Sequence, residues 1–192
     1  MKTIDVTLAK LHDIGSTFYT GKIERDAARS AVIDAIVAKL GCTRVSLWRF
    51  DSGARGGLSL LCFASKRSGG ELVTTEARLD EAEYRAYFDV LVRTGMYVCD
   101  DAMADPHLEP MRRNYLLPNN VRSMLDAAFM VNGRAYGMVC CEQTDTIRHW
   151  RPEEIAVLRA IVAKIALLMA GAGDPVLWGS PSLPMAPFPL GV

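Results

Sequence analysis

Residues 121–143 read VRSMLDAAFMVNGRAYGMVCCEQ, and they contain two apolar runs separated by Asn132-Gly133. Asn-Gly between two such runs is typical of a tight β-hairpin, because both central residues of the favoured two-residue turn need a positive φ. The stretch therefore predicts two antiparallel strands, Val121 to Val131 and Arg134 to Gln143.

Both predicted strands carry a carboxylate among apolar residues. Side chains alternate between the two faces of a strand, so Asp126 shares its face with Met124 and Ala128. In the second strand Glu142 shares its face with Cys140. A charge in such a set is costly unless it is paired or solvated, so we assign this face to a pocket. The opposite face is expected to pack on helices, and it carries Leu125, Ala127, Phe129 and Cys141.

Each carboxylate also has an ordinary structural interpretation, which the sequence leaves open. Asp126 either contacts a ligand or forms an ion pair with Arg112 or Arg122, because structural ion pairs also occupy clefts. Glu142 either faces the pocket or reaches solvent near the end of its strand.

The flanking sequence predicts helices and short strands without the strand–helix–strand repeats of a parallel sheet. Lys22 to Leu40 has helical periodicity and is followed by glycine, which is common after a helix end. Asp80 with an acidic residue three positions later resembles a capping box, so a helix is predicted from Asp80 to about Gly95. Pro152 suits the first turn of a last helix that runs to about Ala170. The shorter predicted elements are strands at 45–50, 58–64 and 97–99 and helical turns at 111–116. This order favours an α+β domain with an antiparallel sheet and helices on both faces.

Composition and charge limit the classes of function. The chain has 192 residues, 50% of them hydrophobic, and its 22 basic residues balance 22 acidic ones. Such a chain is not disordered throughout, and it lacks the basic excess of a general nucleic-acid binder. The five cysteines include no CxxC spacing, and residues 1–17 lack the apolar core of a signal peptide. We therefore expect a cytoplasmic protein with reduced thiols.

The region from Gly95 to Met169 contains several short motifs in a characteristic order. They are YVCDDA at 97–102, DP at 105–106, YL at 115–116, VRSMLD at 121–126, GMVCCE at 137–142, RHW at 148–150 and EE at 153–154. In order and spacing they resemble a GAF domain, the small-molecule-binding module of signalling proteins, and in particular the variety that precedes bacterial histidine kinases and diguanylate cyclases.

The resemblance covers about residues 15–170 and carries expectations for the fold. It implies a GAF/PAS-like α+β domain with a central six-stranded antiparallel sheet. The first and last helices pack on one face, and a ligand pocket lies on the other under the middle segments. We expect a single domain over residues 1–170 and a Pro-rich C-terminal tail over 171–192. This length leaves no room for an attached kinase or cyclase, so a stand-alone module is expected.

Phytochrome-type GAF domains, a more distant resemblance, contact their ligand from a short helix, a Tyr-Leu pair and alternate positions of the hairpin. The matching residues here are Arg112, Tyr115, Met124, Asp126 and Glu142. Together with neighbouring aromatic and polar residues, the candidate ligand-binding set is Tyr84, Tyr87, Asp101, Arg112, Tyr115, Met124, Asp126, Cys140 and Glu142. Tyr84 and Tyr87 have the alternative of being core contacts of a lid, the usual place of aromatic residues at helical spacing.

Departures from the motifs of known GAF subfamilies exclude some classes of ligand but do not identify the ligand. Phytochromes attach a bilin through a Cys next to a His or elsewhere in the lead-in of the domain. Here Pro106 precedes His107, so covalent attachment is excluded at that position. Cyclic-nucleotide GAF domains carry Asn-Lys where Glu142-Gln143 stand, which argues against a cyclic nucleotide. The Cys-rich loop of free-methionine sulfoxide reductases has no counterpart near Cys99, so an enzyme is the less favoured alternative. The histidines lack partners at metal-ligand spacing, and no metal is expected.

The last predicted helix is more apolar than a single buried face requires. One stripe, suited to covering the sheet, is Ile155, Leu158, Val162, Ile165 and Met169. A second stripe contains Val157, Ile161 and Leu168, and the helix is too interrupted by charges for a membrane span. We therefore predict a homodimer through the first and last helices; in the alternative, the tail folds back over the second stripe and keeps the protein monomeric.

Together these patterns predict a sensor or regulatory module. It binds a small molecule and passes the change to a separate signalling protein through its terminal helices. The alternative is an interaction module with a vestigial pocket.

Overall fold

The computed structural model describes residues 2–52, 57–74, 77–131, 134–171 and 177–178. The helices are α1 (Lys2–Tyr19), α2 (Arg25–Leu40), α3 (Arg85–Thr94) and α4 (Pro152–Gly171). The strands are β1 (Arg44–Ser52), β2 (Leu58–Arg67), β3 (Leu72–Val73), β4 (Arg78–Asp80), β5 (Met96–Cys99), β6 (Val121–Val131) and β7 (Arg134–Thr144). Two short helical turns, η1 (Pro106–Met111) and η2 (Arg112–Leu116), precede β6.

The strands form one antiparallel sheet in the order β3-β2-β1-β7-β6-β5, and β4 adds a short strand beside β2. The predicted row of six antiparallel strands is therefore confirmed. The predicted hairpin is also confirmed, since Val131 pairs with Arg134 and Asp126 pairs with Cys140. Its turn, Asn132-Gly133, lies outside the described residues.

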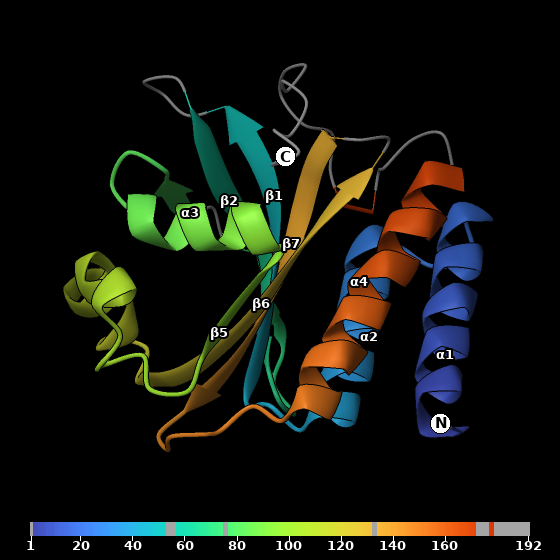
Figure 1. Ribbon diagram of the computed structural model, residues 1–192. Coiled ribbons are helices and arrows are strands. Elements are labelled where there is room, and N and C mark those ends of the chain that lie inside the picture. Colours follow the sequence, from blue (N-terminus) through green and yellow to red (C-terminus); the bar gives the residue numbers. More distant parts are fainter. Residues whose placement is uncertain (1, 53–56, 75–76, 132–133, 172–176, 179–192) are drawn as a thin grey trace.

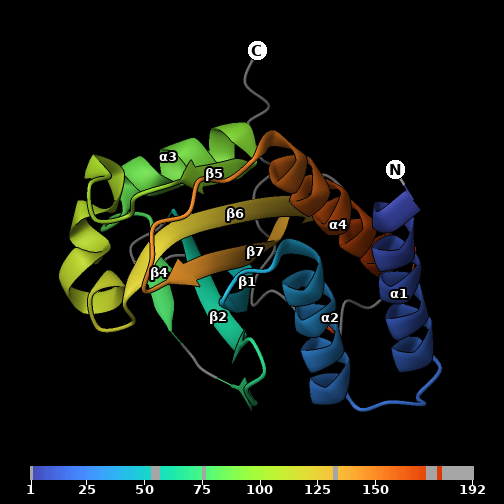
Figure 2. The same cartoon turned by 90° about the horizontal axis from the view of Figure 1, so that it is seen from below.

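Helices cover both faces of the sheet. Figure 1 shows α1, α2 and α4 on one side of the sheet and α3 on the other. In Figure 2, seen from below, α1 lies beside α4 as the outer helix of its layer. The domain is thus a sheet between a three-helix layer and a thinner layer of α3, η1 and η2.

The sheet separates two hydrophobic cores, and the faces of the hairpin fall as predicted. Leu125, Ala127, Phe129 and Cys141 belong to the core under α1, α2 and α4. Met124 and Cys140 belong to the core under α3, and Asp126 and Glu142 share their face by alternation. Cys140 and Cys141 point to opposite cores, as expected from their adjacent positions in a strand.

Helix α1 was not among the predicted elements. Its Leu11 and Ile14 are buried against the rest of the helical layer, with Leu8 and Phe18 partly buried beside them. The spacing of these residues is helical, so the signal was present in the sequence. At Gly15 the helix comes so close to α4 that an added Cβ would lie 3.2 Å from Leu168 Cδ1. Helix α1 of the same chain therefore covers part of the second α4 stripe, which we had expected to meet a second chain.

The helix predicted to begin at Asp80 begins at Arg85 instead. Asp80 is the last residue of β4 and pairs with Ser59 of β2. Its carboxylate accepts a hydrogen bond from Arg78 Nε at 2.9 Å, and its carbonyl accepts from the backbone of Glu83 and Tyr84. Asp80 thus belongs to a strand and a tight turn, whereas the capping-box pattern predicts it as the start of a helix.

Two residues of the predicted tail belong to the helix-side core. Leu177 and Trp178 are both buried there. No described helix is at once long and apolar enough to cross a bilayer.

Candidate ligand-binding site

A cavity of about 700 Å³ opens on the α3 side of the sheet, over β1 and β2 and beside η2. Its size is within the range of small-molecule sites. It is lined by Arg44, Ser46, Trp48, Cys62, Ser65, Lys66, Arg67, Gly70, Glu71, Val73, Ala77, Asn114, Tyr115 and Asn119.

The paired residues of neighbouring strands align with the cavity wall on β1 and β2 in two rows that cross the sheet. One row runs from Arg67 of β2 through Arg44, Glu142 and Met124 to Cys99 of β5. The next row contains Ser65, Ser46, Cys140, Asp126 and Tyr97. The predicted hairpin residues therefore lie in the same rows as the cavity wall, on β7 beside β1 and on β6 beyond it, and they are not among the residues that line the cavity.

Arg44 is the centre of the first row. Its guanidinium forms an ion pair with Glu142 and donates to Asn119 Oδ1 at 2.8 Å. It also donates to Tyr115 Oη at 3.1 Å, and Tyr115 donates to Glu142 Oε1 at 2.6 Å. Burial lowers the pKa of Arg44, but the hydrogen bond and charge of Glu142 outweigh it, so the net shift is upward. The guanidinium is therefore a fixed positive charge in the cavity wall.

The alternative in which Glu142 reaches solvent near the end of its strand is wrong. Its side chain is fully buried beneath Arg44 and Tyr115. A buried carboxylate needs a counter-charge and hydrogen-bond donors, and the β1 strand supplies the counter-charge. Burial, together with the charge of Glu142, raises the pKa of Tyr115 well above its ordinary value, so this residue stays a neutral donor.

Asp126 is the second buried carboxylate. Its Oδ2 accepts a hydrogen bond from the Tyr87 hydroxyl at 2.7 Å, while Oδ1 receives none from a nitrogen or oxygen donor of the described residues. Burial raises the pKa of Asp126 to about 7, although the Cys140 thiol and the Tyr87 hydroxyl act in the opposite direction. The group is therefore poised between its two protonation states near neutral pH.

The alternative pairing of Asp126 with an arginine does not occur among the described residues. Arg112 and Arg122 each have a buried Nε without a hydrogen-bond partner in that part of the chain. Tyr87, not an arginine, is the side chain that contacts the Asp126 carboxylate. Tyr97 lies against Tyr87 with 4.8 Å between the ring centroids. Tyr97 in turn donates to Asp105 Oδ2 at 2.8 Å, which ties β5 to the start of η1.

The structure brings some candidate residues together and leaves others apart. Of the nine, Tyr115 alone is among the described residues that line the cavity. Met124, Asp126, Cys140 and Glu142 are buried in the same rows of the sheet, one or two strands away from β1. Tyr87 and Tyr84 are buried in the core beneath α3, as their alternative interpretation had it. Asp101 accepts a hydrogen bond from the backbone of Met103 within a turn, and Arg112 is half-buried in η2. Neither of these two lines the cavity.

The cavity also contains residues that sequence reasoning missed, chiefly Arg44, Ser46 and Trp48 of β1 and Asn119 after η2. A signal was available for β1, because Arg44 and Ser46 alternate with the buried Val45 and Leu47. No local pattern indicated that Asn119 would reach Arg44, 75 positions away.

The thiols of this face are poor nucleophiles. Burial raises the pKa of Cys62 to about 12 and raises the pKa values of Cys99 and Cys140 well above the ordinary value. A thiolate, the reactive form, is therefore disfavoured at each position. The described residues include no cluster of His, Cys, Asp or Glu that could hold a metal ion.

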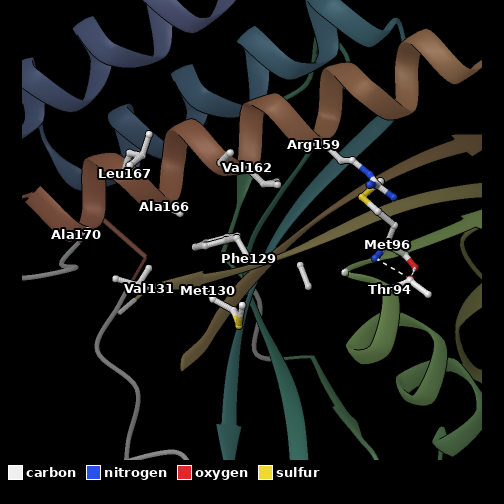
Figure 3. Close-up of a pocket in the computed structure, with 13 residues that line it drawn as sticks. Thr94, Met96, Phe129, Met130, Val131, Arg159, Val162, Ala166, Leu167 and Ala170 are labelled. Atoms are coloured by element: carbon white, nitrogen blue, oxygen red, sulfur yellow. Dashed lines mark hydrogen bonds between the residues drawn. The ribbon is translucent and has the colours of Figure 1, made fainter. Parts of the chain in front are cut away.

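A second hollow lies on the opposite side of the sheet and is apolar. It is a groove of about 640 Å³ between α4, β6 and the segment around Met96. Figure 3 shows Arg159 and Met96 at one end of this groove and Leu167 and Ala170 at the other. Arg159 is the only charged residue among those that line it.

Comparison with known families names the class of domain that this fold defines. The model of the GAF domain family matches residues 24–169, so the chain belongs to the GAF family. No characterised protein of similar sequence was found.

Solved GAF structures have the same fold at low sequence identity. A phycoerythrobilin-bound GAF domain from a cyanobacterial phytochrome superimposes with a TM-score of 0.66 at 16% identity, over 87% of this chain and 96% of that one. The blue-light absorbing form of the Thermosynechococcus elongatus PixJ GAF domain gives 0.62 at 18% identity, over 86% and 89%. The phytochrome photosensory core module of Stigmatella aurantiaca gives 0.64 at 15% identity, over 88% of this chain but 36% of that chain.

Proposed function

We propose that this GAF domain is a sensory or regulatory module that binds a small molecule in the cavity between β1, β2 and η2. The observation that carries the proposal is the cavity of about 700 Å³ with Arg44, Tyr115 and Asn119 held in its wall by a buried hydrogen-bond network. Pockets that recognise small molecules typically combine apolar surface with a few precisely placed polar groups. Here Trp48 and Cys62 supply the apolar surface, and Arg44 keeps donors free for a ligand.

The ligand is held without a covalent bond in this proposal. Three of the similar structures contain a bound bilin. This chain has Pro106 where a Cys next to His107 would be needed, and its five cysteines are all buried. The free, buried thiols also support a reducing, cytoplasmic setting for the module. The raised pKa values of Cys62, Cys99 and Cys140 speak against the alternative of a thiol-dependent reductase.

The test combines an unbiased search with a defined probe. Native mass spectrometry and an absorption spectrum of the purified protein identify a co-purifying ligand, and biliverdin serves as the added probe. Ser65→Phe places a ring in the cavity, and Met130→Phe places the same ring in the apolar groove as the control. We expect Ser65→Phe to weaken binding at least about tenfold, because it occupies the site, and Met130→Phe to leave it unchanged.

Two results would overturn this assignment. Binding that survives Ser65→Phe but is lost in Met130→Phe would move the ligand to the groove. If the purified protein carries no small molecule and neither biliverdin nor a metabolite library shifts its thermal unfolding, the interaction module with a vestigial pocket becomes the better interpretation.

We further propose that two copies associate through the outer surfaces of α1 and α4 and that a separate signalling protein reads their arrangement. Leu167 of α4 and Val6 of α1 are the most exposed large hydrophobic residues in the described part of the chain, at 71% and 69%. Light scattering at micromolar concentration should report a dimer that Leu167→Glu dissociates. The control Leu117→Glu alters a similarly exposed residue on the η2 side and should leave the dimer intact. A monomer for the unaltered protein would disprove this association.

A further inference from the structure

Trp178 is the largest fully buried side chain among the described residues, although it comes after α4 in the region expected to be a tail. Its indole lies edge-on to Phe63 at 5.4 Å and to Phe129 at 5.1 Å between ring centroids. Its Nε1–H donates to the carbonyl oxygen of Trp48 at 2.7 Å. A buried indole normally has its N–H satisfied, so this contact fixes the depth and the orientation of the ring.

The sheet has a position shaped for this indole. At Gly137 of β7 an added Cβ would lie 2.3 Å from Trp178 Nε1, so only glycine permits the ring to sit there. Next to it, Arg29 of α2 donates to the carbonyl of Leu177 at 3.0 Å. The Arg29 guanidinium also lies 4.6 Å from the Phe63 ring. We call the site formed by Arg29, Phe63, Phe129, Gly137 and the Trp48 carbonyl the Trp178 socket.

Trp48 makes contacts on both faces of the sheet. Its carbonyl receives Trp178 on the helix side, while its own side chain lines the ligand cavity on the α3 side. The Trp48 indole N–H donates to Ser46 Oγ at 2.8 Å within that cavity wall. The register of β1 against β2 shifts between Leu47 and Trp48, and such an irregularity interrupts the ladder of the strand locally. Trp178 therefore binds the sheet at the irregular point of the strand that forms the cavity wall.

We propose that residues 177 and 178 are a clasp that couples the cavity to the C-terminal segment. When the indole is in its socket, it holds the Trp48 peptide and the β1 wall in the arrangement that forms the cavity. When the indole leaves, β1 loses a hydrogen bond and its packing at the irregularity, and the wall loosens. A ligand that binds the ordered wall must then favour the docked clasp, because a ligand shifts an equilibrium toward the state it binds better. By reciprocity, the docked clasp favours the ligand by the same factor.

This inference rests on the cavity being the sensory site, but its test needs no ligand. Cys62 pairs with Trp48 across the β1–β2 register and lines the cavity, so its reaction with iodoacetamide reports opening of that wall. Cys42 and Cys141 are buried in the helix-side core and report global unfolding in the same sample. Mass spectrometry resolves the modification rate of each thiol.

Trp178→Phe keeps an aromatic ring in the socket and removes the donor to Trp48. Trp150→Phe is the matched control, because Trp150 Nε1 is buried without a hydrogen-bond partner among the described residues. We expect Trp178→Phe to raise the Cys62 rate about fivefold, the ratio that corresponds to a hydrogen bond of about 1 kcal/mol, and Trp150→Phe to leave the Cys62 rate unchanged. Gly137→Ala, which displaces the indole without altering it, is expected to act on Cys62 in the same direction.

Three results would overturn the clasp. An unchanged Cys62 rate in Trp178→Phe would show that the indole does not hold the cavity wall. A rise of the same factor at Cys42, Cys62 and Cys141 would show a loss of global stability alone. An equal effect of Trp150→Phe on Cys62 would show that any tryptophan replacement loosens the wall. Because no ligand is used, the clasp can fail while the proposed function stands. If the proposed function fails instead, a faster Cys62 reaction in Trp178→Phe still shows that the indole holds the β1 wall, so the two failures are distinguishable.

Discussion

Replacement of Arg44 by methionine removes the counter-charge of Glu142 and keeps much of the side-chain volume. Glu142 is fully buried, and its carboxylate has Arg44 and Tyr115 as its side-chain donors. In Arg44→Met, of the side-chain donors among the described residues, the Tyr115 hydroxyl at 2.6 Å alone continues to donate to it. Removal of one partner from a buried ion pair costs about 3–5 kcal/mol, because the remaining charge is uncompensated. We therefore expect the free energy of unfolding to fall by about 4 kcal/mol, a large part of the roughly 5–15 kcal/mol typical of a domain.

Urea denaturation followed by circular dichroism at pH 7 measures this change. With a dependence of about 2–3 kcal/mol per molar urea, the midpoint should fall by about 1.5 M. Arg67→Met is the matched control, because Arg67 lies opposite Arg44 in the strand register but is exposed. Its effect should stay within about 0.5 kcal/mol, as for most surface substitutions.

A double variant separates the ion pair from general disturbance of the wall. Arg44→Met combined with Glu142→Met removes both charges, and it should be more stable than Arg44→Met alone, since no buried charge is left unpaired. The reasoning would be refuted if Arg44→Met costs less than about 1 kcal/mol. It would also be refuted if the double variant loses the full sum of the two single losses, since independent sites behave in that way.

Two further predictions concern Asp126 and Gly137. Burial raises the pKa of Asp126 to about 7, above the roughly 3.9 of an unfolded chain. Between these values the native state binds more protons than the unfolded state, so stability falls as pH rises from about 4 to about 7, by roughly 4 kcal/mol from this group. Asp126→Asn should lack this pH-dependent part of the stability. Urea titrations of both proteins across that pH range measure it, and parallel plots of unfolding free energy against pH would contradict the prediction. Gly137→Ala places a Cβ within 2.3 Å of Trp178 Nε1 and 2.6 Å of Phe129 Cζ, so we expect a loss of about 1–3 kcal/mol, as for other overpacked cores. A thermal unfolding midpoint equal to that of the unaltered protein would show that the indole does not occupy the socket.

Much of the fold was predictable because its signals are local. The β6–β7 hairpin follows from Asn132-Gly133 between two alternating runs, and alternation alone assigned Asp126 and Glu142 to the face opposite Leu125 and Cys141. The predicted start of α3 was wrong because the capping-box pattern at Asp80 ignored its pairing with β2. A local propensity is overridden when the same backbone groups find partners in a sheet.

The candidate site was only partly predictable. Tyr115 and Glu142 were identified from the sequence, but their common partner Arg44 was not, because strand pairing between β1 and β7 brings it there across 98 positions. Packing of α3 on the sheet likewise brings Tyr87, not an arginine, to Asp126.

The amino-acid sequence by itself determined the class of the domain, the hairpin and the polar face of the sheet, since these depend on turn chemistry and on the two-residue period of a strand. Only the tertiary structure decided which charges meet on that face, that α1 covers part of the second stripe of α4, and that Trp178 fills a socket over Gly137. Those contacts join segments far apart in the chain. Which residues meet depends on how the whole domain packs, and a local sequence pattern does not contain that information.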